Sequence, residues 1–335
     1  MMSNMALEDM AATRSREDND RLRTAPTLDA LYAQVDPLDL TPGWISRKSP
    51  IMGSTPKSVF EPAHWRYADA QAGLDAAGRL VDVAFAERRN LILRNPKDGN
   101  DWATSRTLVC AYQMILPGEF APSHRHSANA LRVIIDGKGT YSIVDGEKMP
   151  MESGDVVLTP GGHFHGHGHD GDHPAYWLDC LDVPLNYLLE PMYFQPDTQP
   201  TPPVTDWVEQ SPFRFSKAMI VAGLDAAEVS SDGRTGQRFV LPTPSMPAVG
   251  LEVERLEGGR NYAWSRAGAN RIYSVMEGRG ELRVENRRYS FVKGDTIVVP
   301  SGNWAQIVPA VDSMALELSD APLMRFANSY FMEWR

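Results

Sequence analysis

The chain has 335 residues, 42% of them hydrophobic, which is enough for two domains with separate cores. Its formal net charge of −10 argues against a nucleic-acid or anionic-membrane partner, because both require clustered positive charge. No apolar run reaches membrane-spanning length and the polar start does not resemble a secretory leader, so we expect a cytoplasmic protein with two free, buried cysteines.

The first part of the chain is predicted to consist of helices and loops. Residues 1–25 are charged and polar without periodicity, and we expect a mobile tail. From Thr27 the run TLDALYAQV has apolar residues at helical spacing behind a capping threonine, and a second helical pattern covers roughly Asp69 to Leu93. These patterns make residues 26–100 an N-terminal segment of helices and loops.

Beyond Asp101 the sequence changes to short segments rich in Val, Ile, Leu and Tyr, separated by turn signals such as LPGE, DGKG and TPGG. Strands at such spacing predict antiparallel barrels or sandwiches. The Pro-rich stretch QPDTQPTPP, which starts at Gln195, is expected to form a linker or a covering arm. The predicted boundaries are 101–194 for a first β unit, 195–235 for the linker and 236–335 for a second β unit.

An internal repeat relates the two β units. The stretch LPGEFAPSHRHSANALRVIIDGKG, from Leu116, matches LEGGRNYAWSRAGANRIYSVMEGRG, from Leu256, with one residue inserted. Further on, SGDVVLTPGG matches KGDTIVVPSG. Two such matches at nearly the same separation are hard to obtain by chance, so we infer two copies of one β unit.

The copies differ at three histidines of the first copy. In the alignment His124 faces Trp264, His126 faces Arg266 and His165 faces Ala305. A requirement of the scaffold should act on both copies, so the difference indicates chemistry in the first. The comparison weakens the alternative interpretation of the HxH pair as two exposed imidazoles on a surface strand.

These histidines have the spacing of a metal site. Residues two apart on a β-strand point to the same face, so His124 and His126 can reach one ion, and His165 could supply a third ligand from another strand. Three imidazoles suit Fe, Mn, Ni, Cu or Zn and leave coordination positions open. The tract from His163 to His169 holds more histidines than one ion accepts, so we assign the ligand to His165 and a supporting role to His167.

The GxxxxxHxH spacing, the GDxxxxP turn and the later histidine resemble the cupin superfamily. The stretches AERRNLILRNP, QMILPGEFAPSHRHSANALRVIIDGKGTYSIVDGE and WLDCLDVPL resemble those of bicupin gentisate, salicylate and 1-hydroxy-2-naphthoate dioxygenases. The resemblance implies a mainly β bicupin, with two double-stranded β-helix (jelly-roll) barrels, a helical N-terminal segment and metal ligands in the first barrel only. Cupins usually supply a carboxylate ligand where this chain has Ala130, so a neutral site of three histidines is expected.

The resemblance further implies an iron(II)-dependent dioxygenase of aromatic-acid catabolism, without an organic cofactor. An ortho-hydroxybenzoate would chelate the iron, and O2 would enter between the carboxyl-bearing and hydroxyl-bearing carbons to give an open-chain oxo-diacid. A homotetramer or dimer is implied as well. Two other classes stay open: a non-enzymic bicupin that binds an aromatic acid, and a cupin isomerase or hydrolase that uses zinc or manganese.

The resemblance also places polar residues around the substrate. Arg88 and Arg132 match arginines suited to a carboxylate, Gln113 matches a substrate-contacting glutamine, and His167 matches a histidine that hydrogen-bonds substrate or oxygen and could move a proton. Asp179 is assigned to the same substrate region, where it could orient His167 or another ligand. Structural ion pairs for the charged residues, and a backbone-bonded Gln113, are the alternatives.

One stretch departs from the family pattern. Typical gentisate enzymes read near SWTWHDHG where this chain has GGHFHGHG, so Gly162 and Phe164 replace tryptophans and Gly166 replaces an acidic residue. We expect an altered pocket wall beside the iron. The candidate substrates are therefore gentisate, salicylate and 5-substituted salicylates such as 5-chloro- or 5-nitrosalicylate.

Overall fold

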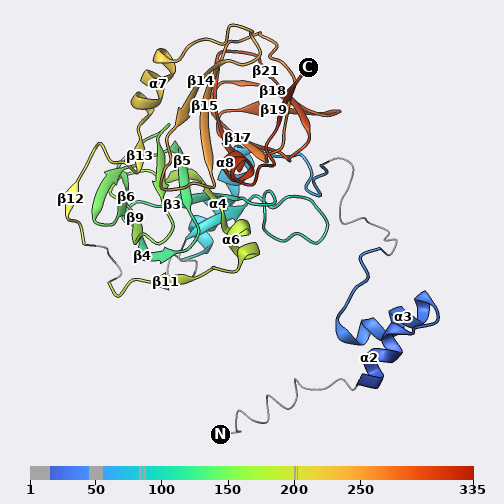
Figure 1. Ribbon diagram of the computed structural model, residues 1–335. Helices are drawn as coiled ribbons and strands as arrows, with labels where there is room; N and C mark the ends of the chain where they lie inside the picture. Colours follow the sequence, from blue (N-terminus) through green and yellow to red (C-terminus); the bar gives the residue numbers. More distant parts are fainter. Residues whose placement is uncertain (1–15, 45–55, 83–84, 86–87, 200, 202) are drawn as a thin grey trace. The chain divides into compact units, whose positions relative to one another are not determined.

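The computed structural model describes residues 16–44, 56–82, 85, 88–199, 201 and 203–335 (Figure 1). Its N-terminal part contains α2 (Arg16–Arg23), α3 (Leu28–Val35) and the 3-10 helix η1 (Asp36–Leu38). The Thr27 side chain accepts a hydrogen bond from the Ala30 N–H at 3.1 Å, which confirms the predicted start of α3. Helix α2 lies where only a tail was expected, and residues 1–15 of that tail fall outside the described residues.

The segment before the first barrel contains a helix between two strands. Helix α4 (Tyr67–Leu80) follows β1 (Ala63–Trp65) and precedes β2 (Arg89–Ile92). The prediction that this helix continues to Leu93 is wrong, because Val81 already has extended dihedral angles and β2 pairs with β3. A strand ladder satisfies backbone N–H and C=O groups as a helix does. The spacing of apolar residues alone therefore did not show where the helix ends and the strand begins.

Two sheets enclose the first barrel. One has, in spatial order, β13 (Arg214–Phe215), β8 (Val156–Thr159), β5 (Ala130–Asp136), β10 (Ala175–Leu181), β3 (Val109–Ile115) and β2. The other has β11 (Phe194–Pro196), β4 (Phe120–His126), β9 (His165–His169), β6 (Thr140–Val144), β7 (Glu147–Pro150) and β12 (Asp206–Trp207). The predicted linker thus contributes β12 and β13 to this barrel, and β11 lies at its start.

Two further sheets enclose the second barrel. One has, in spatial order, β1, β20 (Thr296–Val299), β17 (Arg271–Glu277), β22 (Ser313–Ser319), β15 (Gly250–Leu256) and β14 (Gln237–Leu241). The other has β19 (Arg287–Val292), β18 (Arg279–Val284), β21 (Trp304–Pro309), β16 (Ser265–Ala267) and β23 (Met332–Trp334). Helix α6 (Val183–Leu189) follows β10, α7 (Lys217–Ala226) precedes β14, and α8 (Ala321–Phe326) follows β22. The predicted mainly β bicupin fold is confirmed.

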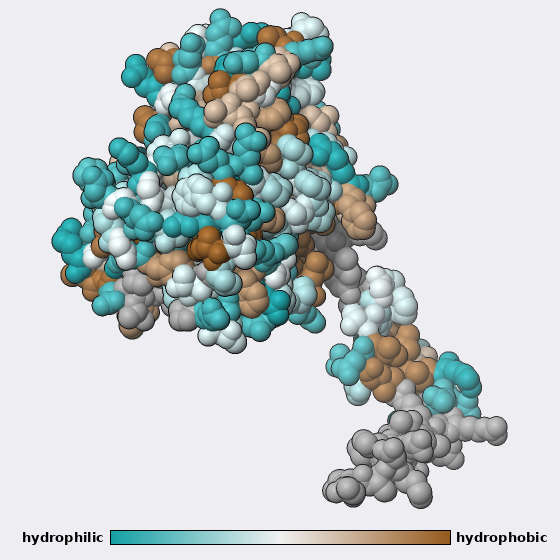
Figure 2. Space-filling model, turned by 90° about the vertical axis from the view of Figure 1, so that its left-hand side faces the viewer, coloured by the Kyte–Doolittle hydropathy of each residue, from teal (hydrophilic) through white to brown (hydrophobic). Residues whose placement is uncertain are grey.

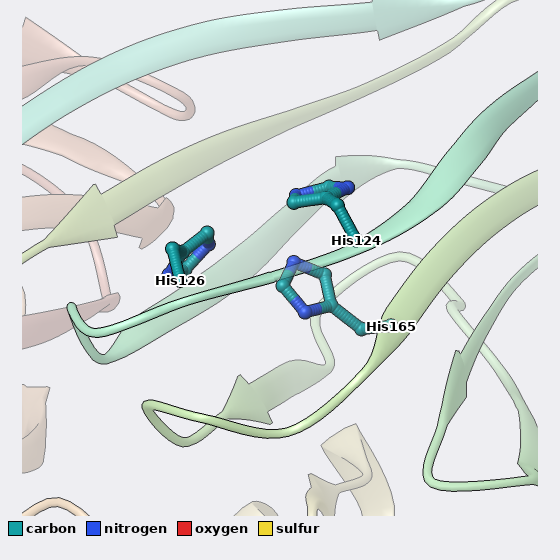
Figure 3. A group of neighbouring side chains, drawn as sticks. All are labelled: His124, His126 and His165. Carbon is teal, nitrogen blue, oxygen red and sulfur yellow. The ribbon is translucent and has the colours of Figure 1, made fainter. Parts of the chain in front are cut away.

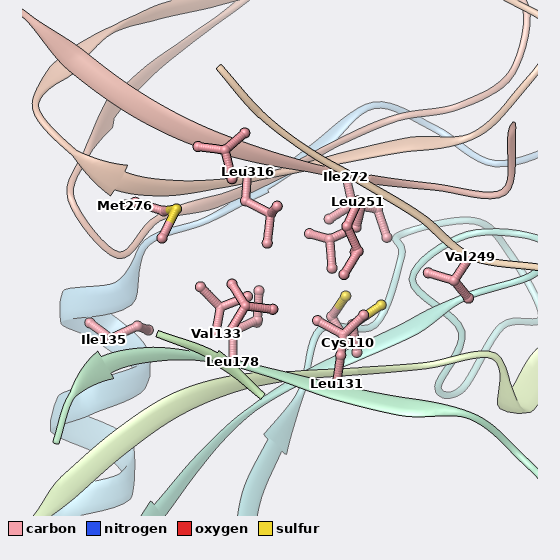
Figure 4. Packing of buried hydrophobic residues seen from close by; sticks show 14 of the residues in the cluster. Cys110, Leu131, Val133, Ile135, Leu178, Val249, Leu251, Ile272, Met276 and Leu316 are labelled. Atoms are coloured by element: carbon pink, nitrogen blue, oxygen red, sulfur yellow. The ribbon is translucent and has the colours of Figure 1, made fainter. Parts of the chain in front are cut away.

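A shared hydrophobic core joins the two barrels. Buried side chains from the sheet that contains β5 and β10 and from the sheet that contains β17 and β22 form one cluster, in which those of the two barrels face each other (Figure 4). Leu131 and Leu178 of the first barrel and Leu251 and Leu316 of the second are at most 1% exposed. The outer surface is different: Figure 2 shows a face on which hydrophobic residues are scattered among hydrophilic ones. Within the described residues, none of the helices could cross a membrane.

The barrels share a turn that the sequence repeat predicts. Gly154 and Gly294 have φ values of +91° and +92°, which favour glycine, and each precedes an aspartate. Asp155 accepts a hydrogen bond from the Glu152 N–H, and Asp295 accepts one from the Val292 N–H. The same local chemistry therefore closes the same turn twice.

The predicted alignment is one residue out of register at β4. Strand β4 sets His124 opposite His165, and β16 sets Ser265 opposite Ala305. The extra residue of the second copy therefore lies in the loop before β16, where the two copies have little in common. The counterparts of His124 and His126 are Ser265 and Ala267, not Trp264 and Arg266, while Ala305 is confirmed as the counterpart of His165. The second barrel still offers no imidazole at these three positions.

Candidate metal centre

Three histidine side chains converge inside the first barrel (Figure 3). His124 and His126 lie two residues apart on β4, and His165 is the register partner of His124 on β9. One ring nitrogen from each histidine lies within 4.8 Å of the other two. The fold thus brings together the three residues that the sequence predicts as ligands.

Backbone carbonyls orient these rings. The Nδ1 atoms of His124, His126 and His165 lie 2.9, 2.8 and 3.0 Å from the carbonyl oxygens of Pro122, Ala128 and His163. A carbonyl oxygen can only accept, so Nδ1 carries the proton and Nε2 keeps its lone pair. Nε2 of His124 and Nε2 of His165 are buried without a hydrogen-bond partner. Buried acceptors that converge in this way fit a divalent metal ion.

Burial keeps the three imidazoles neutral. The pKa of His124 is lowered to about 3 and that of His126 to about 4, mainly by desolvation, and the nearby guanidinium groups of Arg88 and Arg132 contribute to both shifts. Desolvation also lowers the pKa of His165 well below its ordinary value. Neutral imidazole is the form that binds a metal ion. The cluster found among the described residues contains no carboxylate, as Ala130 suggests.

Arg132 lies beside the histidines in a buried ion pair. Its Nε is 3.2 Å from Asp179 Oδ1, and its Nη1 donates a hydrogen bond of 2.7 Å to Thr159 Oγ1. Burial lowers the pKa of Arg132 and raises the pKa of Asp179, whereas the charge of each residue acts against the shift of the other. Asp179 therefore pairs with Arg132, and its expected role in orienting His167 has no hydrogen bond to support it.

The two adjacent arginines before β3 have different surroundings. Arg89 is buried and forms a two-pronged ion pair with Glu119, with N–O distances of 2.6 and 2.7 Å. Arg88 is half-buried and close enough to His124, His126 and His167 to lower the pKa of each. Arg89 thus forms a structural ion pair, and the charge of Arg88 acts on the histidines.

Gln113 and His167 are both buried on the strands that enclose the site. Gln113 lies on β3, is 3% exposed and faces Trp177 of β10. His167 follows His165 by two residues on β9, so both rings point into the barrel, and their centroids are 5.8 Å apart. Neither ring nitrogen of His167 has a hydrogen-bond partner.

The other histidines of the tract have structural partners. His163 is half-exposed and contacts Asp145, and His169 Nδ1 is 3.0 Å from the Thr140 hydroxyl. Neither belongs to the cluster of ring nitrogens.

Phe194 is a residue of the site that sequence reasoning missed. It lies on β11 opposite His126, and its ring stacks on His124 with centroids 5.0 Å apart and an interplanar angle of 23°. About half of its side-chain surface is exposed, so it stands at an open side of the site. The aromatic pair in MYFQ, directly before the Pro-rich stretch, was the available signal.

Two of the three positions at which GGHFHGHG departs from the family pattern lie away from the barrel interior. Phe164 and Gly166 alternate with His165 and His167 along the chain, so they face away from the barrel interior, and the Phe164 ring lies against Arg125. Gly162 has a φ of +86°, and Gly302 repeats this conformation in the second barrel with +82°. A turn that both barrels share therefore requires glycine at position 162.

This chain is similar in sequence to a domain family and to individual proteins of known activity. The cupin domain family matches residues 111–181. A gentisate 1,2-dioxygenase from Ralstonia sp is 45% identical over 157 residues, a match that spans 47% of this chain and only 44% of that relative. The 5-aminosalicylate 1,2-dioxygenase from Comamonas sp is 32% identical over 336 residues, which cover 90% of this chain and 89% of the relative.

A solved structure extends the likeness to the fold. Salicylate 1,2-dioxygenase from Pseudoaminobacter salicylatoxidans, in its adduct with gentisate, superimposes with a TM-score of 0.83 at 26% identity. The match covers 92% of this chain and 94% of that protein, so both barrels are included. With its three-histidine cluster in the first barrel, the chain belongs to the cupin family of gentisate, salicylate and 5-aminosalicylate 1,2-dioxygenases.

Proposed function

We propose that the chain is an iron(II)-dependent dioxygenase that cleaves the ring of an ortho-hydroxybenzoate. The bond between the carboxyl-bearing and hydroxyl-bearing carbons breaks, and both atoms of O2 enter the open-chain oxo-diacid. The observation that carries this proposal is the convergence of three neutral imidazoles beside Arg132, in a chain of the 1,2-dioxygenase family.

Iron(II) is the proposed ion, held by Nε2 of His124, His126 and His165. Imidazole suits first-row divalent metals, and a neutral ligand set accepts a dianionic hydroxy-acid without accumulating excess negative charge. When bound, the ion supplies positions for the two substrate oxygens and for O2, and a path for electrons between them.

Arg132 and Arg88 are the proposed carboxylate-binding groups. The triad is neutral, so these guanidinium groups supply the positive charge that an incoming hydroxybenzoate anion needs. Asp179 and Thr159 hold Arg132 from two directions, which limits its rotamers before the substrate arrives. Asp179 is thus proposed as a positioning residue, not as a direct substrate contact.

Gln113 and His167 are the proposed neutral hydrogen-bonding groups. The unpartnered ring nitrogens of His167 can donate to, or accept from, an oxygen of the substrate. His167 can also hold a proton at one of these nitrogens while the ring opens. Gln113, on the facing sheet, supplies an amide that both donates and accepts.

The substrate is proposed to be gentisate, salicylate or a 5-substituted salicylate. Relatives of this chain carry the names of gentisate, 5-aminosalicylate and 5-nitrosalicylate enzymes. Because Phe164 and Gly166 face away from the triad, the GGHFHGHG stretch gives no reason to set gentisate aside. The free, buried thiols of Cys110 and Cys180 support work in a reducing cytoplasm.

Oxygen uptake tests this proposal. The full chain would be reconstituted with iron(II) without air and then mixed with O2 and gentisate, salicylate, 5-aminosalicylate, 5-nitrosalicylate or 1-hydroxy-2-naphthoate. We expect uptake of one O2 per molecule of at least one acid, with a ring-opened oxo-diacid as product. If a sample with a full complement of iron consumes no O2 with any of these acids, the dioxygenase proposal fails.

A further inference from the structure

Ser142 and His167 form an unusual pair in the first barrel. They lie directly opposite each other on β6 and β9, so their side chains share the inner face, and each is 0% exposed. The Ser142 hydroxyl and both ring nitrogens of His167 have no hydrogen-bond partner. Three buried polar atoms without partners in one place call for a ligand that satisfies them.

The neighbouring pairs on the same two strands do not share this deficit. One step along, Thr140 faces His169, and their Oγ1 and Nδ1 atoms bond directly at 3.0 Å. On the other side Val144 faces His165, one of the proposed metal ligands. The ladder therefore permits a direct hydroxyl–imidazole bond, yet Ser142 and His167 do not form one.

The second barrel shows that the scaffold does not need polar groups here. The same register on β18 and β21 pairs Leu282 with Ile307, and both belong to an apolar cluster. Val284 and Ala305 correspond to Val144 and His165, which fixes the correspondence of the two ladders. An apolar pair would satisfy the fold without buried polar atoms, so the Ser142–His167 pair points to a function of the metal-binding barrel.

We propose that one water molecule binds between Ser142 Oγ and a ring nitrogen of His167, and that Ser142 is a positioning residue for His167. Water fits because a hydroxyl and an imidazole require a small partner that both donates and accepts. Trp177 closes another side, with its ring centroid 6.2 Å from that of His167. With one nitrogen tied to the water, His167 presents the other nitrogen to the substrate. The inference deepens the proposed function, since it concerns the histidine assigned to substrate contact.

The direct test is structural and needs no turnover. Crystals of the full chain loaded with iron(II) without air, and of its Ser142→Ala variant, would be compared at high resolution. We expect one ordered water between Ser142 Oγ and His167 in the first, and its loss together with a reoriented or more mobile His167 ring in the second. A wild-type structure without that water, or a variant with an unchanged His167 ring, overturns the proposal whether or not the protein consumes O2.

Kinetics provide an independent readout. If the proposed reaction is observed, Ser142→Ala should lower kcat about tenfold at unchanged iron content, and Ser142→Thr, which keeps a hydroxyl, should recover part of the loss. In a His167→Asn background Ser142→Ala should have no further effect, because the two residues act as one unit. An equal loss in both backgrounds contradicts the proposal. Ser274→Ala, at a buried serine of the second barrel, is the matched control and should leave kcat unchanged.

Discussion

Arg132 and Asp179 face each other across β5 and β10, with Arg132 Nε 3.2 Å from Asp179 Oδ1 in the interior of the first barrel. Their side chains are only 2% and 9% exposed, so neither charge has solvent as a substitute partner. Removal of one residue would strand the other charge in a buried environment. The pair therefore links the stability of the barrel to the position of the proposed carboxylate-binding group.

Arg132→Ala is expected to lower the free energy of unfolding by about 3 kcal/mol or more and, in an active sample, to raise KM for the acid. Urea unfolding of Arg132→Ala, Asp179→Ala and the double variant would measure the coupling. The double variant should lose less stability than the sum of the single losses, since no unpaired charge remains. Additive losses would contradict a coupled pair. Arg66→Ala, which breaks the exposed Arg66–Asp69 pair, should leave the free energy of unfolding nearly unchanged, because solvent screens both charges.

His165→Ala should abolish retention of the metal ion, because two imidazoles would remain where three converge. Metal content per chain after gel filtration, measured by mass spectrometry, would report this loss. His163→Ala is the control, since His163 lies two residues away, outside the cluster and beside Asp145. Equal metal content in the two variants would refute the ligand assignment of His165.

Features that both barrels share could be predicted from the sequence, and so could the difference between them. Asn129 and Asp182 clamp a turn of the first barrel through a 2.7 Å bond, and Asn270 and Asp320 repeat that clamp in the second. Such scaffold chemistry appears in both copies of the repeat. The three histidines appear only in the first copy. This difference between the copies identified the triad before its geometry was known.

Contacts made by long-range strand pairing could not be predicted in the same way. Phe194 reaches His124 only because β11 returns to pair with β4, and nothing in its Pro-rich surroundings specifies that partner. Asp179 finds Arg132 through the register of β10 with β5, which local sequence patterns leave undefined. The wrong extension of α4 to Leu93 has the same cause, because β2 gains its ladder from β3.

Acidification should destabilise the metal-free protein. Burial holds the pKa of His124 at about 3 and that of His126 at about 4, against an ordinary value of 6.5. Below pH 6.5 the unfolded chain therefore binds protons that the folded chain does not, so the free energy of unfolding falls as the pH falls towards 4. The expected slope is roughly 1.4 kcal/mol per pH unit for each imidazole.

Urea unfolding of the metal-free chain at near-neutral pH and at about pH 5 would measure this slope. The double variant His124→Gln/His126→Gln lacks both titrating groups and should lose less stability over the same interval. An identical pH dependence in the two proteins would show that other groups cause the acid sensitivity. Bound metal should oppose the loss, because the ion competes with protons for the same ring nitrogens.

Phe194→Ala should weaken substrate binding while leaving the metal in place. The ring stacks on His124 and is half-exposed, so its loss removes an aromatic wall of the site without opening a cavity in the core. An aromatic contact of this kind is worth about 0.5–1.5 kcal/mol, which corresponds to a rise in KM of about two- to tenfold.

Steady-state oxygen uptake and metal content of Phe194→Ala would be compared with those of Phe194→Leu and Tyr187→Ala. Leucine retains apolar bulk but not the stacked ring, so a similar KM for the two Phe194 variants would assign the effect to the ring itself. Tyr187, on α6, is 70% exposed and serves as the control for loss of a surface aromatic residue. Loss of metal from Phe194→Ala would instead show that the stacked ring holds His124 in its ligand position, and unchanged KM and metal content would remove Phe194 from the site.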